Sequence, residues 1–135
     1  CLERPLSVLR VLVIDDTVAD FDLINISMET ALGDGVTLDH ASTVDAAAAL
    51  IGENDYSIIL HDLFLPPSGP EGVLETYKIA RNIPIIAMSG QSSPELHRTA
   101  VANGAKLFCR KSDLDGDNIA SILSQILPAF GPEGR

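Results

Sequence analysis

The chain alternates short apolar runs with stretches in which apolar residues recur every three or four positions. The first run, 8–14, is almost entirely aliphatic and stops at two consecutive aspartates, which is typical of a strand buried on both faces. From Thr17 to Leu32 the apolar side chains follow helical spacing, and Gly33-Asp34-Gly35 supplies a C-cap and a turn. Repetition of this alternation predicts five strand-helix units.

The later units are bounded by caps and breakers. The predicted strands are 36–41, 56–60, 83–88 and 105–110. The predicted helices are 44–51, capped by Ser42 or Thr43 and ended by Gly52; 73–80; 94–103, with Pro94 in its first turn and Gly104 after it; and a last helix with an apolar stripe over 119–127, ended by Pro128. This order predicts an α/β fold, a doubly wound parallel sheet of (βα)5 type.

Size and composition restrict the organisation and the partners. With 135 residues, of which 46% are hydrophobic, we expect a single domain over 1–135, with a core at about 8–128 and a tail at 129–135. The formal charge of -10 argues against a nucleic-acid-binding face, which needs clustered Lys and Arg. No apolar run is long enough for a bilayer span, so we expect no membrane insertion.

Cysteine and histidine usage argues against a disulfide and a transition-metal site. Cys1 lies at the terminus and Cys109 lies within an apolar run, which fits a reducing cytoplasm. The histidines His40, His61 and His97 show no metal-ligand spacing. We expect His61 to be a structural residue and Cys109 a small buried apolar residue.

Polar residues end four of the predicted strands. Asp15 and Asp16 follow the first, Asp62 the third, Ser89 the fourth and Lys111 the fifth. In an open parallel sheet, ligands bind beyond the carboxyl ends of the strands, so these side chains should gather at one edge. Three crowded carboxylates stay ionised if a cation neutralises them, and hard oxygen ligands indicate Mg²⁺. A carboxylate in such a site can attack phosphorus while a lysine and a hydroxyl bind the phosphoryl oxygens.

In this order and spacing, four segments resemble the receiver domains of bacterial response regulators. They are VLVIDD (11–16), IILHDLFLP (58–66), IPIIAMSG (83–90) and GAKLFCRKS (104–112). The resemblance implies a CheY-like, flavodoxin-like sheet with strand order 2-1-3-4-5. It implies that Asp62 is the phosphoacceptor. Asp16, Asp15 and the backbone carbonyl of Phe64 would bind Mg²⁺ together with Asp62.

The resemblance also assigns a switch and its partners. Ser89 matches the switch hydroxyl, Lys111 the lysine of the site, and Phe108 the aromatic that changes rotamer on activation; Gln91 is at a position that influences the phosphoryl lifetime. The implied partners are a histidine kinase or histidine phosphotransfer protein and a downstream effector protein. A homodimer would form through helix 4, strand 5 and helix 5. Such a chain is not an enzyme in its own right, although it assists its own phosphorylation and dephosphorylation.

Some positions depart from the pattern. Ser112 follows Lys111 where the family usually has proline after a cis peptide, so this loop either keeps a strained cis bond or is rebuilt. His61 precedes Asp62 where an apolar residue is usual, and the loop 66–72 is unusually long and rich in proline. We expect that loop to be a partner-specific contact.

Two other functions are compatible with the same sheet. A phosphohydrolase with an aspartyl nucleophile would need a second acid two residues after Asp62, and that position holds Phe64. A degenerate receiver would keep the fold as a docking or dimerisation module without phosphorylation. Loss of the acidic pair, the acceptor or the lysine would indicate the second alternative, and all of them are present.

Overall fold

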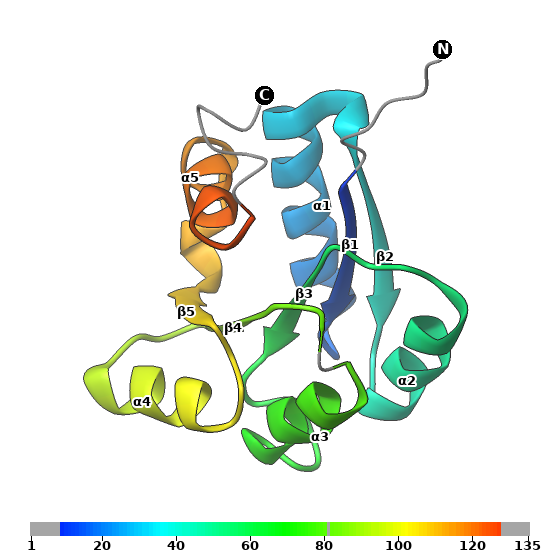
Figure 1. Cartoon of the computed structure of the whole chain (residues 1–135). Coiled ribbons are helices and arrows are strands. Elements are labelled where there is room, and N and C mark those ends of the chain that lie inside the picture. The colour runs from blue at the N-terminus through cyan, green and yellow to red at the C-terminus, as the bar shows by residue number, and fades with distance from the viewer. Residues whose placement is uncertain (1–8, 81, 128–135) are drawn as a thin grey trace.

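The chain folds as a five-stranded parallel sheet with helices on both faces. The computed structural model describes residues 9–80 and 82–127, in which strands and helices alternate throughout (Figure 1). The strands are β1 Leu9–Ile14, β2 Val36–Ala41, β3 Ile58–Asp62, β4 Ile85–Ser89 and β5 Leu107–Arg110. The helices are α1 Val18–Leu32, α2 Val44–Glu53, α3 Glu71–Ile79, α4 Pro94–Ala102 and α5 Gly116–Ile126, with 3-10 turns η1 Gly33–Gly35 and η2 Lys111–Asp113.

The strand order is β2-β1-β3-β4-β5, and every neighbouring pair is parallel. The predicted fold class and strand order are therefore confirmed. The order reverses at β1, which lies between β2 and β3. Because sheets of this kind bind ligands where the order reverses, the carboxyl ends of β1 and β3 are the expected place for a functional site.

Two apolar layers cover the sheet. Along β1, Val11 and Val13 belong to the layer under α1 and α5, whereas Leu12 and Ile14 belong to the layer under α2, α3 and α4. Figure 1 shows α1 and α5 side by side on one face of the sheet and the other three helices across it. The period of two along a strand explains why β1 is apolar at nearly every position: both of its faces are buried.

Several predicted boundaries were wrong by a few residues. β3 begins at Ile58 rather than at Tyr56, and β4 begins at Ile85 rather than at Ile83. β5 begins at Leu107 rather than at Ala105. Tyr56 and Ala105 are buried, but they lie before the point where the neighbouring strand begins to pair. An apolar pattern therefore located buried positions, which extend beyond the hydrogen-bonded ladder.

The helix ends also needed correction. α2 continues through Gly52 to Glu53, and Asn54 ends it with a side-chain hydrogen bond to the Leu50 carbonyl. Thr43, rather than Ser42, caps the start of α2 by accepting from the Ala46 N–H. α3 begins two residues earlier than predicted, at Glu71. Among the predictions, Val8, Pro128, the tail 129–135 and Cys1 lie outside the described residues.

Candidate functional site at the carboxyl edge of the sheet

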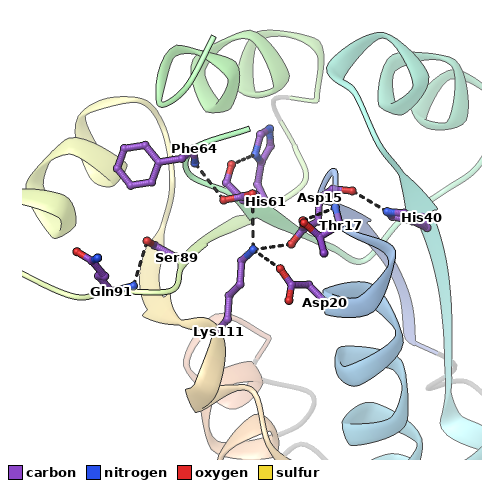
Figure 2. Close-up of polar contacts among 10 residues, drawn as sticks. Asp15, Thr17, Asp20, His40, His61, Phe64, Ser89, Gln91 and Lys111 are labelled. Atoms are coloured by element: carbon purple, nitrogen blue, oxygen red, sulfur yellow. Dashed lines mark hydrogen bonds and ion pairs between the residues drawn. The ribbon is translucent and has the colours of Figure 1, made fainter. Parts of the chain in front are cut away.

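The five predicted side chains lie at one edge of the sheet. Asp15 directly follows β1, Asp62 ends β3, Ser89 ends β4 and Lys111 follows β5. Asp16 stands between β1 and α1. Figure 2 shows Lys111 reaching from the end of β5 toward the acidic residues at the ends of the central strands. Residues up to 96 positions apart in the chain (15 and 111) therefore meet because parallel strands all end at the same side.

Asp15, Asp16 and Asp62 form an acidic cluster. One carboxylate oxygen of each lies within 4.8 Å of the others. Asp15 is fully buried and Asp62 is 7% exposed, whereas Asp16 is exposed to solvent. Two of three like charges are thus removed from water, so the cluster needs a positive partner to remain ionised.

Lys111 is the positive partner that the structure provides. Its Nζ lies 2.9 Å from Asp15 Oδ2 and 3.6 Å from Asp62 Oδ2. It also donates a 2.7 Å hydrogen bond to Asp20 Oδ2 on α1. Burial alone would lower the pKa of Lys111, but its close contacts with Asp15 and Asp20 and the charge of Asp62 outweigh it and raise that pKa. The lysine is therefore charged at neutral pH.

Asp62 has a pKa above its ordinary value. Burial is the largest cause, and the negative charges of Asp15 and Asp16 act in the same direction. The Phe64 N–H, which donates to Asp62 Oδ1 over 3.1 Å, and the Lys111 charge oppose them. One oxygen of Asp62 is thus oriented by the backbone while the other faces the lysine.

The donors at this edge fit a hard divalent cation. Asp15 Oδ1 accepts the Thr17 N–H over 2.9 Å, but Asp15 Oδ2 is buried without a hydrogen-bond partner among the described residues. Lys111 lies close to that oxygen, yet only as an ion pair. A buried carboxylate oxygen with free lone pairs, beside two further carboxylates, suits a cation with oxygen preference such as Mg²⁺ or Ca²⁺. The predicted ligands Asp15, Asp16 and Asp62 are therefore brought together.

The predicted switch residues lie on the adjacent strands. Ser89 is 5% exposed and its Oγ accepts the Gln91 N–H over 3.3 Å. Phe108 is 8% exposed and belongs to the apolar layer under α2, α3 and α4, with the His97 ring packed edge-on at 6.2 Å. Phe108 is therefore a core residue of that layer. The Phe64 side chain is exposed, so its own contribution to a site would come from its backbone.

The loop after Lys111 is rebuilt rather than strained. Lys111–Asp113 form the turn η2, which the Asp113 carboxylate closes by accepting from the Arg110 backbone and guanidinium. Within the described residues the cis peptide is Pro66-Pro67, so the bond between Lys111 and Ser112 is trans. The 3-10 turn η2 thus positions Lys111 at the site although position 112 holds serine rather than the expected proline.

Two polar residues near the site, Asp20 and His40, were missed by sequence reasoning. Asp20 contacts Lys111, and His40 donates from Nε2 to the Asp15 carbonyl over 2.7 Å while stacking on Phe21 at 4.7 Å. His61 was correctly predicted to be structural, and it is fully buried beside the acceptor. The available signal was position: Asp20 is one helical turn after Asp16, and His40 is one residue before the end of a strand that pairs with β1.

The hydrogen bonds of His61 fix its tautomer. Nδ1 donates to the Asp62 carbonyl and Nε2 accepts from the Thr76 hydroxyl on α3, each over 2.9 Å. Burial lowers the pKa of His61 to about 4, against weaker opposing hydrogen bonds. The neutral ring therefore joins the end of β3 to α3.

Replacing Thr76 with valine should destabilise the domain by about 1 to 3 kcal/mol, because a buried imidazole nitrogen loses the donor that it has among the described residues, at nearly constant side-chain volume. Urea unfolding followed by far-UV circular dichroism measures this change. Thr99→Val is the matched control, since the Thr99 hydroxyl makes no hydrogen bond to a described residue. If Thr76→Val and Thr99→Val lower the free energy of unfolding equally, the hydrogen bond to His61 makes no net contribution to stability.

Two further observations concern the rest of the molecule. Among the described residues, no helix has both the length and the apolar character needed to cross a membrane.

Cys109 is a free, buried thiol in β5, and burial raises the pKa of that thiol to about 12. The expectation that Cys109 is a buried apolar residue is confirmed.

Solved structures of response regulators share this fold. The chemotaxis response regulator CheY4 of Vibrio cholerae gives a TM-score of 0.74 at 20% identity, over 88% of this chain and 98% of that one. A CheY-like receiver domain protein of Methanospirillum hungatei gives 0.74 at 22% identity, over 95% and 100%. A response regulator protein of Burkholderia pseudomallei with a phosphorylated aspartic acid, a calcium ion and citrate gives 0.70 at 23% identity, over 90% and 68%.

The likeness is one of structure. No protein-family model matches the sequence, and no curated protein matches it. The chain therefore has the fold of CheY-like receiver domains, as its motifs predicted.

Proposed function

We propose that this chain is a phosphoacceptor domain that takes a phosphoryl group on Asp62 and thereby switches a protein-interaction surface. The observation that carries the proposal is the position of Asp62: it ends the central strand β3, faces Lys111 at 3.6 Å and lies within 4.8 Å of two further carboxylates. A structurally similar response regulator contains a phosphorylated aspartic acid and a calcium ion. The shared fold, together with an aspartate at the end of the central strand, supports phosphorylation of Asp62 here.

The transfer needs a nucleophile and a means of stabilising phosphoryl oxygens. An oxygen of Asp62 forms a bond to phosphorus, and the bond between phosphorus and the donor breaks with its electron pair leaving on the donor. Lys111 and the Ser89 hydroxyl would interact with the phosphoryl oxygens. Asp15, Asp16, Asp62 and the Phe64 carbonyl would hold Mg²⁺, which when bound withdraws charge from those oxygens.

The modification should be reversible. Water attacks phosphorus, the bond to Asp62 breaks, and the carboxylate is restored with release of inorganic phosphate. In aspartyl phosphohydrolases a second acid two residues after the nucleophile assists such steps, but here Phe64 stands at that position with an exposed ring. This residue favours a signalling domain that dephosphorylates slowly over a turnover enzyme. Gln91, whose N–H donates to the Ser89 hydroxyl, would influence the lifetime, as the resemblance implies.

The output follows from the neighbours of Ser89. If the Ser89 hydroxyl turns toward the phosphoryl group, it gives up its bond to the Gln91 N–H, and Phe108 can change rotamer beside it. That motion would alter the surface of α4, β5 and α5, where an effector protein or a second copy of the chain would bind. The donor would be a histidine kinase or a histidine phosphotransfer protein.

Incubation with acetyl phosphate and Mg²⁺, read by intact mass, tests the proposal. The parent should gain one phosphoryl unit, and Asp62→Asn should gain none. Asp22→Asn, which removes an exposed carboxylate from α1, should label like the parent. No gain by the parent, under conditions that label a control receiver, would favour a phosphorylation-independent docking module instead.

A further inference from the structure

Lys111 has two close carboxylate partners and a third that lies farther away. An ammonium group carries three N–H donors. Asp20 and Asp15 lie 2.7 and 2.9 Å from Nζ, and Asp62 follows at 3.6 Å. Figure 2 shows the ammonium pointing between Asp15 and Asp20. A phosphoryl oxygen on Asp62 that draws Nζ toward itself would lengthen one of the two close contacts, to Asp20 or to Asp15.

Burial decides which partner gives way. Asp15 is fully buried, so water cannot take the place of Lys111 beside its Oδ2. The Asp20 side chain is 32% exposed. A released Asp20 carboxylate can be hydrated by water at little cost. Asp20 is therefore the partner that a phosphoryl oxygen displaces most easily.

We propose that Asp20 is a positioning residue that holds Lys111 in the unphosphorylated domain and releases it when Asp62 is modified. The inference rests on the function proposed above. A contact made before the reaction and lost during it stabilises the ground state alone, so it slows the reaction. Asp20 thus tunes how readily the domain is phosphorylated.

The local structure explains how Asp20 reaches the lysine. Asp15 Oδ1 accepts the N–H of Thr17, which is the N-cap of α1, and Asp20 lies in the first turn of that helix. Acidic residues are also common in first turns because they interact with the helix dipole. That ordinary role would make Asp20 a stabiliser of α1 without effect on the chemistry, so the test must separate the two.

The first measurement is the rate of labelling by acetyl phosphate at saturating Mg²⁺. Asp62 forms the new bond to phosphorus, and acetate leaves with the electron pair of the broken bond. Asp20→Asn should label about three- to fivefold faster than the parent, as expected for loss of one partly exposed ion pair. Asp20→Glu should return the rate toward that of the parent. Asp22→Asn, a charge-matched change on the same helix, should leave it unchanged.

The second measurement is the affinity for Mg²⁺ alone, by isothermal titration calorimetry. Without Asp20, Lys111 is left to Asp15 and Asp62, the two carboxylates that the cation needs. Asp20→Asn should therefore bind Mg²⁺ about threefold more weakly, whereas Asp22→Asn should bind like the parent.

Three results would overturn the inference. The first is labelling of Asp20→Asn at the same rate as Asp22→Asn. The second is labelling of Asp20→Asn more slowly than the parent, which a loosened helix α1 would produce. Both leave the proposed function intact, provided that the parent is labelled. A parent that takes up no phosphoryl group overturns the proposed function, and this inference falls with it.

Discussion

Replacing Lys111 with methionine should slow the labelling of Asp62 by acetyl phosphate at least about a hundredfold. The ammonium is the one cationic group found within 4 Å of the Asp15 and Asp62 carboxylates in the described structure. Loss of a preorganised group that stabilises developing charge typically costs two to three orders of magnitude in rate. Methionine keeps much of the aliphatic stem, so the packing against the end of β5 changes little. Intact mass as a function of time gives the rate.

Lys106→Met is the matched control for that experiment. Lys106 is an exposed lysine just before β5, whereas Lys111 comes just after the same strand. The two positions therefore lie at opposite edges of the sheet, and Lys106→Met should label like the parent. If Lys111→Met labels within a few-fold of Lys106→Met, the lysine has no role in the transfer, and the site chemistry proposed for it is wrong.

Asp62→Asn should make the domain more stable than the parent at neutral pH when no divalent cation is present. Asparagine can still accept the Phe64 N–H, but it removes one of the like charges that lie within 4.8 Å of one another. Two such charges repel each other by about 1 kcal/mol in bulk water and by about 3 kcal/mol at a protein surface. The attraction between Lys111 and Asp62 offsets part of this repulsion. We therefore expect a gain of about 1 kcal/mol in the free energy of unfolding.

The pH dependence of this gain has a definite sign. Burial raises the pKa of Asp62 above its ordinary 3.8, so the folded state binds the proton more tightly than the unfolded chain does. Above the folded-state pKa, the ionised carboxylate therefore lowers the free energy of unfolding by its full amount. This loss of stability disappears as the pH falls through that pKa toward 3.8. Urea unfolding of parent and variant in EDTA, from pH 8 down to pH 4.5, should show converging stabilities.

Asp22→Asn provides the baseline for the same series, because it removes an exposed carboxylate of α1 that forms no ion pair with a described residue. Its difference from the parent should stay small and nearly constant with pH. A parent that is as stable as Asp62→Asn at pH 8 would contradict the crowding of charge described for this edge of the sheet.

The central site could be predicted from the sequence because its members end strands. Once five parallel strands were assigned, Asp15, Asp62, Ser89 and Lys111 had to meet, since all the carboxyl ends lie at one edge. An error of two residues at the start of a strand, as at Tyr56, does not move its other end away from that edge. The prediction therefore tolerated inexact boundaries.

The supporting residues could not be predicted in the same way. Asp20 lies within α1 and His40 within β2, so neither follows the end of a strand. Their contacts with the site depend on how α1 and β2 pack beside β1. His40 stacks on Phe21 and bonds to a backbone carbonyl, which no local pattern specifies. The turn η2 was also beyond the sequence pattern, because a side chain three residues after Arg110 closes it. Such contacts arise from tertiary packing rather than from periodicity.

The buried thiol of Cys109 has a practical consequence. Since the thiolate is the form that reacts, a thiol whose pKa is raised to about 12 should react slowly with alkylating reagents and mild oxidants while the domain is folded. Cys109 lies next to Phe108 in β5, under the side chains of α5. The rate at which Cys109 is alkylated therefore measures how often β5 and α5 separate.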